Sequence, residues 1–118
     1  MQPEHEKINY LELPSRNLKF TREFFSKVFS WQFTDYSADY IAFANTGIEG
    51  GFYTSDQVSI AEHGSALVIF YSKDLSATQE KIQSAGGKIS KPVFEFPGGR
   101  RFHFIEPGGN ELAVWSDI

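Results

Sequence analysis

The side chains that could carry out acid, base or anion-binding chemistry lie mostly near the end of the sequence. The stretch RRFHFIE places Arg101 and His103 two residues apart, and ELAVW begins with Glu111. Alternation along a strand puts the first two side chains on one face and the flanking Phe102 and Phe104 on the other. An imidazole beside a fixed cation can bind a carboxylate or phosphate, or move a proton. We therefore expect Arg101 and His103 to face a cleft, with an exposed polar strand face as the alternative.

Other familiar reaction motifs are absent from the sequence. It contains no cysteine, which excludes disulfides, thiolate nucleophiles and Cys-ligated zinc or iron-sulfur sites. His5 lies in a polar N-terminal segment without the second histidine of an HExxH zinc motif, and His63 lies in a loop. No glycine-rich nucleotide-binding pattern is present. A metal site would therefore need His, Asp or Glu side chains.

The composition indicates a single folded domain over residues 1–118. Apolar residues make up 41% and charged residues 22% of the sequence, which is too hydrophobic for a disordered chain. The formal net charge of −4 argues against the broad positive surface that nucleic acid or an anionic bilayer requires. The N-terminal segment MQPEHEK carries charge where a secretory signal needs apolar residues, and no apolar run approaches the ~20 residues of a membrane span. We expect a cytoplasmic protein that binds neither nucleic acid nor membranes.

Strand and helix signals recur along the chain in a regular order. A strand is predicted over 8–13 and a helix after the N-cap residue Asn17, followed by three short strands that begin near Trp31. A strand over 65–72 and a helix capped by Asp74 come next. The remaining predicted strands are KISKPVFEF, RRFHFIE and NELAVWS.

The two halves of the sequence form an internal repeat. Aligning Asn17 with Asp74, a shift of 57 residues, places SRNLKFTREFF opposite SKDLSATQEKI. Beyond loops of different length, a shift of 61 residues places YIAFANTG opposite RFHFIEPG. Each half is too small to be stable alone. The sequence therefore predicts an α+β fold of two βαβββ modules, about 7–56 and about 64–117, with paired mixed sheets that form a cleft. An α+β domain whose halves are alike by chance is the alternative.

The repeat and two of its segments resemble a known family. LPSRNLKFTREFFSKVFSW and FIEPGGNELAVW are similar to stretches of the vicinal oxygen chelate superfamily, which contains glyoxalases, bleomycin-resistance proteins and extradiol dioxygenases. The resemblance covers nearly the whole chain, and the first helix departs from the family pattern at Asn17, Thr21, Phe25 and Ser30. It implies the glyoxalase/bleomycin resistance fold. If the protein is an enzyme, the resemblance implies a glyoxalase (lactoylglutathione lyase)-like or dioxygenase-like one.

The resemblance also implies where a metal ion would bind. In the metal-dependent members, His or Glu side chains from the first and last strands of each module hold a divalent ion in the cleft. The corresponding positions are Tyr10, Phe52, Leu67 and Ala113, and none of them is a His or a carboxylate. Only Glu12 and Glu111 are nearby carboxylates, each two residues from such a position. We therefore predict no metal ion and no other cofactor.

These observations lead to one functional hypothesis and two alternatives. The hypothesis is a glyoxalase-like protein that lacks the family's metal site and binds a small, partly aromatic molecule in its cleft, and we expect it to be a homodimer. A metal-dependent lyase, isomerase or dioxygenase that uses Glu12, Glu111 and His103 is one alternative, and a non-catalytic interaction module is the other. Whether the modules pair within one chain or between two stays open. The predicted ligand-binding residues are Tyr10, Glu12, Phe52, Leu67, Arg101, His103, Glu111, Ala113 and Trp115.

Overall fold

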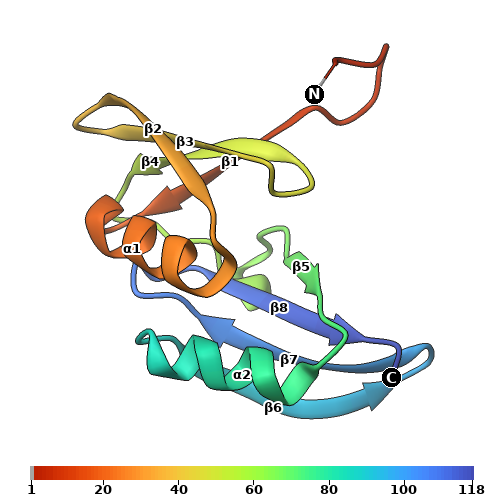
Figure 1. The fold of residues 1–118 in the computed structure, drawn as a ribbon. Coiled ribbons are helices and arrows are strands. Elements are labelled where there is room, and N and C mark those ends of the chain that lie inside the picture. The colour runs from red at the N-terminus through yellow and green to blue at the C-terminus, as the bar shows by residue number, and fades with distance from the viewer. Residues whose placement is uncertain (1) are drawn as a thin grey trace.

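The first module is a four-stranded sheet with one helix packed against it. The structure is a computed structural model and describes residues 2–118. The Asn17 side chain accepts a hydrogen bond of 2.9 Å from the Phe20 amide and so caps the helix start. Ser30 ends the helix in the left-handed conformation, with φ 60°. The elements are β1 (Tyr10–Ser15), α1 (Leu18–Phe29), β2 (Gln32–Ser37), β3 (Tyr40–Ala44) and β4 (Glu49–Thr54) (Figure 1).

The second module repeats this order of elements. The Asp74 side chain accepts a hydrogen bond of 3.1 Å from the Ala77 amide, in the same capping position as Asn17. Gly86, with φ 97°, takes the positive φ that ends the helix region. The predicted α+β fold of two βαβββ modules is confirmed. The elements are a short 3-10 helix η1 (Ala61–His63), β5 (Val68–Tyr71), α2 (Leu75–Ser84), β6 (Lys88–Phe96), β7 (Gly99–Ile105) and β8 (Glu111–Ser116).

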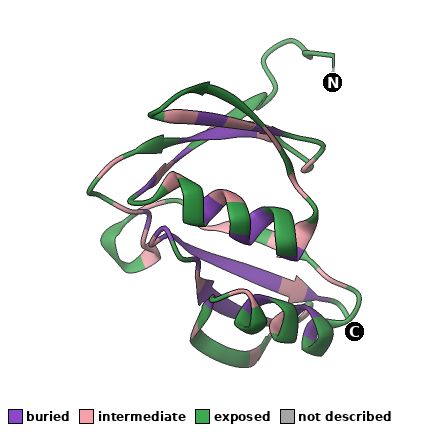
Figure 2. Ribbon diagram, turned by 60° about the vertical axis from the view of Figure 1, so that its left-hand side comes forward, coloured by how far each residue is buried: buried purple, intermediate pink, exposed green. Residues whose placement is uncertain are grey.

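Each module forms a separate mixed sheet with the same strand order. The orders are β1-β4-β3-β2 and β5-β8-β7-β6, so β1 and β5 each lie at an edge. The edge strand of each sheet runs parallel to its neighbour, β4 or β8, and the other pairs are antiparallel. Figures 1 and 2 show α1 between the first sheet and β8. No helix within residues 2–118 is long and apolar enough to cross a membrane.

A single hydrophobic core extends across both modules. Phe24 and Phe25 of α1 are buried, and the Phe24 ring centroid lies 5.8 Å from that of Phe104 on β7. Figure 2 shows that β8 is buried along most of its length. Full burial of a side chain of this size contributes about 1.5–3 kcal/mol. The first helix therefore holds the two sheets together through its phenylalanines.

The turn EPGGN between β7 and β8 joins the modules through a buried polar network. The Thr21 hydroxyl donates to Glu106 Oε1 at 2.9 Å, and Asn110 Nδ2 donates to Glu106 Oε2 at 2.8 Å and to the Pro14 carbonyl at 2.6 Å. Asn110 Oδ1 accepts from the Ser59 amide at 2.9 Å. Burial raises the pKa of Glu106 despite these hydrogen bonds. This junction network fixes the turn against the first module, so the turn has a structural role.

Candidate functional site

The face of each sheet away from its helix carries the polar side chains. In the first sheet, Tyr10 and Glu12 of β1 lie beside Glu49 and Gly51 of β4 in the strand register. Phe52 points the other way: it is fully buried, and its ring stacks on Phe25 of α1 with centroids 5.4 Å apart. The structure therefore corrects the expectation that Phe52 lines a cleft with Tyr10.

The reason for this correction is a difference of one residue between two turns. Residues 45–48 separate β3 from β4, whereas residues 106–110 separate β7 from β8. The shift of 61 residues that aligns β3 with β7 therefore becomes 62 for the last strands. In the register, Gly51 pairs with Glu12 and Ala113 pairs with Ile69. Gly51 is thus the counterpart of Ala113, and a slip of one residue turns a side chain to the opposite face.

Two tyrosines and a glutamate form a hydrogen-bonded group on the first sheet. The Tyr40 hydroxyl donates to Glu12 Oε2 at 2.9 Å, and the Tyr10 and Tyr40 hydroxyl oxygens are 2.6 Å apart. Because the Tyr40 proton is committed to Glu12, Tyr10 donates to Tyr40. Burial and these two hydrogen bonds raise the pKa of Tyr40. Tyr40 is not among the predicted site residues, although the repeat aligns it with Arg101.

A histidine and a glutamate form a buried pair on the second sheet. His103 Nδ1 lies 2.9 Å from Glu111 Oε2, and the two residues are 2% and 8% exposed. The Ala61 amide of η1 donates to the other carboxylate oxygen, Glu111 Oε1, at 3.0 Å. Burial would raise the pKa of Glu111, but the hydrogen bonds from His103 and Ala61 and the charge of Lys91 outweigh it and lower this pKa. Glu111 is therefore an ionised carboxylate that orients the imidazole.

Two buried polar atoms, one in this pair and one on the neighbouring Arg101, have no hydrogen-bond partner. His103 Nε2 and Arg101 Nε are the buried side-chain nitrogen or oxygen atoms of residues 2–118 that make no hydrogen bond. An ionised carboxylate only accepts, so Nδ1 donates to Glu111 and, in the neutral ring, Nε2 carries the lone pair. The alternation expected for β7 holds, because Phe102 and Phe104 are buried in the core on the opposite face.

Aromatic rings lie close to the two side chains that carry these atoms. Arg101 Cζ lies 5.3 Å from the Phe94 ring centroid and 5.6 Å from that of Phe96. The Phe94 and His103 ring centroids are 5.8 Å apart. A pocket of about 280 Å³ lies beside Arg101, and we call it the Arg101 pocket. Its walls are Ile69, Phe96, Arg101 and Trp115.

The predicted site residues therefore fall into two groups. Arg101, His103, Glu111, Ala113 and Trp115 lie together on β7 and β8, where Ala113 pairs with His103 and Trp115 pairs with Arg101. The half-buried Leu67 immediately precedes β5 at the edge of this sheet. Tyr10 and Glu12 belong to the other sheet, with Tyr40. Residues 2–118 contain no group of three or more His, Cys, Asp or Glu side chains that could hold a metal ion.

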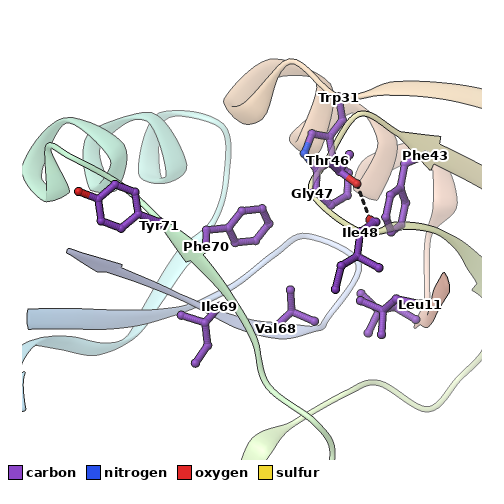
Figure 3. Close-up of a pocket in the computed structure, with 11 residues that line it drawn as sticks. Leu11, Trp31, Phe43, Thr46, Gly47, Ile48, Val68, Ile69, Phe70 and Tyr71 are labelled. Carbon is purple, nitrogen blue, oxygen red and sulfur yellow. Dashed lines mark hydrogen bonds between the residues drawn. The ribbon is translucent and has the colours of Figure 1, made fainter. Parts of the chain in front are cut away.

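A second pocket, of about 370 Å³, lies between the modules on the core side (Figure 3). The Phe70 ring points toward Trp31 across it, with centroids 5.8 Å apart. The hydrogen bond drawn there runs from the Thr46 hydroxyl to the Ile48 carbonyl, at 2.6 Å. Most of the walls are apolar, and no cluster of charged groups converges on the space. This pocket lacks the chemistry of the Arg101 pocket.

Comparison with known proteins gives a family and a fold. A sequence model of the Glyoxalase/Bleomycin resistance protein/Dioxygenase superfamily matches residues 7–114. A glyoxalase/bleomycin resistance protein/dioxygenase family enzyme from Burkholderia phytofirmans PsJN superposes with a TM-score of 0.78 at 15% identity, covering 94% of this chain and 98% of that one. The fosfomycin resistance protein FosX from Listeria monocytogenes superposes with a TM-score of 0.75 at 18% identity, covering 94% of this chain and 93% of that one. TioX from Micromonospora sp. ML1 superposes with a TM-score of 0.69 at 17% identity, covering 95% of this chain and 99% of that one. No curated protein sequence matches the chain.

Proposed function

The chain belongs to the Glyoxalase/Bleomycin resistance protein/Dioxygenase superfamily, and on this premise we propose that it binds a small, partly aromatic molecule in the Arg101 pocket without a metal ion. The observation that carries the proposal is Arg101, whose buried Nε has no partner, in the wall of an aromatic pocket, with the unpartnered Nε2 of His103 two residues away on the same strand. Ligand sites are typically apolar hollows with a few polar groups that fix orientation. The Arg101 pocket has this character.

The side chains at the family's ligand positions support a metal-free site. After the correction of register, these positions are Tyr10, Gly51, Leu67 and Ala113, and none offers an imidazole or carboxylate. Among the remaining candidates, His103 and Glu111 hydrogen-bond to each other, and Glu12, on the other sheet, accepts a hydrogen bond from Tyr40. The two that lie together are fewer protein ligands than divalent ions ordinarily take. The donor set does not fit a divalent ion, and we derive no chemistry through one.

The two groups of polar residues also support a homodimer. Each sheet ends in an edge strand, β1 or β5, that has a partner on one side only. Ile8, Tyr10 and Ile69, at or beside these edges, are 84%, 45% and 44% exposed. Unpaired edges and exposed apolar side chains are typical of surfaces that another chain covers. In the proposed dimer the Tyr10, Glu12 and Tyr40 face of one copy closes the Arg101 pocket of the other.

Ligand binding is tested with a panel of small aromatic acids and their neutral analogues. We expect some of them to raise the melting temperature and to quench the fluorescence of Trp115, which lines the pocket. Trp115→Phe should abolish the quenching. The matched control is Trp31→Phe, because Trp31 lies in the pocket of Figure 3 and not in the Arg101 pocket. The proposal would be contradicted if no member of the panel binds, or if Trp115→Phe and Trp31→Phe lose the quenching equally.

The metal-free part of the proposal is tested separately. Protein purified without added metal should contain no stoichiometric divalent ion by elemental analysis. Added Ni²⁺, Zn²⁺ or Mn²⁺ should leave the melting temperature and the affinity for the aromatic acids unchanged. About one bound ion per chain, lost in Glu111→Gln, would instead support the metal-dependent alternative.

A further inference from the structure

We infer that the Arg101 pocket binds a flat aromatic acid that also carries a hydroxyl group, with the acid group on Arg101 and the hydroxyl on His103. This inference rests on the proposed function and narrows it to one chemical class of ligand. The anion accepts hydrogen bonds from the guanidinium, and the ligand hydroxyl donates to His103 Nε2. Binding in this way gives both unpartnered atoms a partner.

The two atoms differ in what they need from a ligand. Arg101 Nε carries an N–H group and can only donate, whereas His103 Nε2 of the neutral ring can only accept. Both are buried without a hydrogen-bond partner, a situation that native structures seldom leave uncompensated. A ligand that offers one acceptor and one donor is therefore complementary to this face of β7.

The neighbours of His103 select one tautomer of its neutral ring. Both oxygens of Glu111 accept hydrogen bonds, Oε2 from His103 Nδ1 at 2.9 Å and Oε1 from the Ala61 amide at 3.0 Å. The carboxylate is held from two elements, β7 and η1, and cannot rotate away without losing one of these bonds. In the neutral ring the carboxylate therefore keeps the proton on Nδ1 and the lone pair on Nε2.

The surroundings of Arg101 select an anion. Within residues 2–118 no ion pair involves Arg101. Its guanidinium lies over the rings of Phe94 and Phe96, which leaves N–H groups in the guanidinium plane for an acceptor. A planar fork of donors matches a carboxylate. Arg101 is thus a cation without a carboxylate partner in residues 2–118.

The spacing and the walls select a flat, aromatic ligand body. Arg101 and His103 are two residues apart on one strand face, so their Cα atoms are separated by about 6.7 Å. The acid group and the hydroxyl should therefore lie on separate parts of a ring. Phe96 and Trp115 line the pocket and can contact the ring faces. Benzoates with a hydroxyl in the 3 or 4 position meet these requirements.

The test measures the affinity of four probes by calorimetry: benzoate, phenol, 3-hydroxybenzoate and 4-hydroxybenzoate. We expect at least one hydroxybenzoate to bind about tenfold more tightly than benzoate, because only it satisfies His103. His103→Phe should remove this advantage and leave benzoate binding in place. His5→Phe, at an exposed histidine of the N-terminal segment, is the matched control and should keep the advantage. Arg101→Met should weaken the acids but not phenol.

A second variant tests the same inference without removing the imidazole. In Glu111→Gln the Ala61 amide holds the side-chain oxygen, so the new NH₂ group donates to Nδ1 and the ring proton moves to Nε2. The ¹⁵N chemical shifts of the His103 ring should show this change of tautomer. The preference should then change from 4-hydroxybenzoate toward 4-methoxybenzoate, which can only accept at that position.

Three results would overturn the inference. If benzoate and the hydroxybenzoates bind equally well and Trp115→Phe weakens all of them, the pocket binds aromatic acids but not through His103, and only the inference fails. If no probe binds while other aromatic molecules quench Trp115, the ligand class is wrong and the proposed function stands. If no molecule of either panel binds, both the inference and the proposed function are contradicted. Should His103→Phe fail to fold, the Glu111→Gln comparison decides.

Discussion

The Tyr40 hydroxyl lies directly over Gly51, so that a Cβ atom at position 51 would be 2.3 Å from Tyr40 Oη. The missing side chain lets Tyr40 reach from β3 across β4 to Glu12 on β1. Gly51 is the counterpart of Ala113, the small residue between Ile69 and His103 in the second sheet. At two positions where the family resemblance places metal ligands, this chain therefore has its smallest side chains, and neighbouring polar groups occupy the faces.

The first prediction concerns this contact. Gly51→Ala should displace Tyr40 and break its hydrogen bonds with Tyr10 and Glu12, so that its raised pKa falls toward the ordinary value of 10.0. Because the folded state holds the Tyr40 proton more tightly, this group stabilises the fold below pH 10.0 and ceases to do so as the pH rises through the raised pKa. Tyrosine absorbance against pH measures the change.

Two further variants identify the signal. Tyr40→Phe should remove one late-titrating tyrosine and leave Tyr71, whose pKa is raised by its hydrogen bond with Asp117. Tyr36→Phe, at an exposed position on β2, should leave both. A Gly51→Ala protein that titrates like the wild type would show that Tyr40 does not need the space above Gly51.

The second prediction concerns the junction network. Asn110→Ala leaves the Ser59 amide, the Pro14 carbonyl and Glu106 Oε2 each without a hydrogen bond. Since an unsatisfied buried group costs about 1–3 kcal/mol, the free energy of unfolding should fall by about 3 kcal/mol or more. Urea unfolding measures it. Asn9→Ala, at an exposed position, is the matched control and should change little.

The pH dependence of the same variant gives a further check. The folded-state pKa of Glu106 lies above its ordinary 4.5, so the stability associated with this group is present below pH 4.5 and is lost as the pH rises through the raised value. Asn110 lowers this pKa by its hydrogen bond, and Asn110→Ala should raise it further. The loss of unfolding free energy in Asn110→Ala, relative to the wild type, should therefore grow as the pH rises from below 4.5. A deficit that is constant with pH would mean that Glu106 is not coupled to Asn110.

Much of the fold follows from local signals in the sequence. Asn17 and Asp74 could be recognised as helix caps at a shift of 57 residues, and both cap helices in the structure. Alternation along β7 correctly separated Arg101 and His103 from the core residue Phe104. Periodicity succeeds here because each helix or strand buries one face against the same core.

The parts of the site that could not be predicted depend on long-range geometry. Phe52 was misplaced because one turn is a residue longer than its counterpart, which changes the face of every following side chain. Phe94 and Phe96 were missed because the register of β6 shifts between Lys91 and Phe94, so simple alternation does not apply there. Tyr40 was missed because its partners lie on another strand, beyond the glycine that it covers.

The third prediction tests the corrected position of Phe52. Phe52→Ala removes a fully buried ring that contacts Phe25, Phe33 and Phe43, and should lower the free energy of unfolding by about 3–5 kcal/mol. Phe96→Ala removes a half-buried ring at the Arg101 pocket. It should cost less stability but weaken the binding of aromatic acids. The opposite pattern in denaturant unfolding and calorimetry would place Phe52 at the ligand site instead of in the core.

The fourth prediction concerns the unpaired edge of the first sheet. Ile8 lies two residues before β1, the strand that has only β4 as its partner, and is 84% exposed. If a second copy covers this edge, Ile8→Lys places a charge in an apolar contact and should weaken the dimer by about tenfold or more in analytical ultracentrifugation. Ile118→Lys is the control, because Ile118 is 71% exposed at the far end of the chain and away from β1. A wild-type protein that stays monomeric at high concentration would exclude the dimer. In that case the Arg101 pocket, whose four walls come from β5, β6, β7 and β8 of one chain, would have to bind its ligand alone.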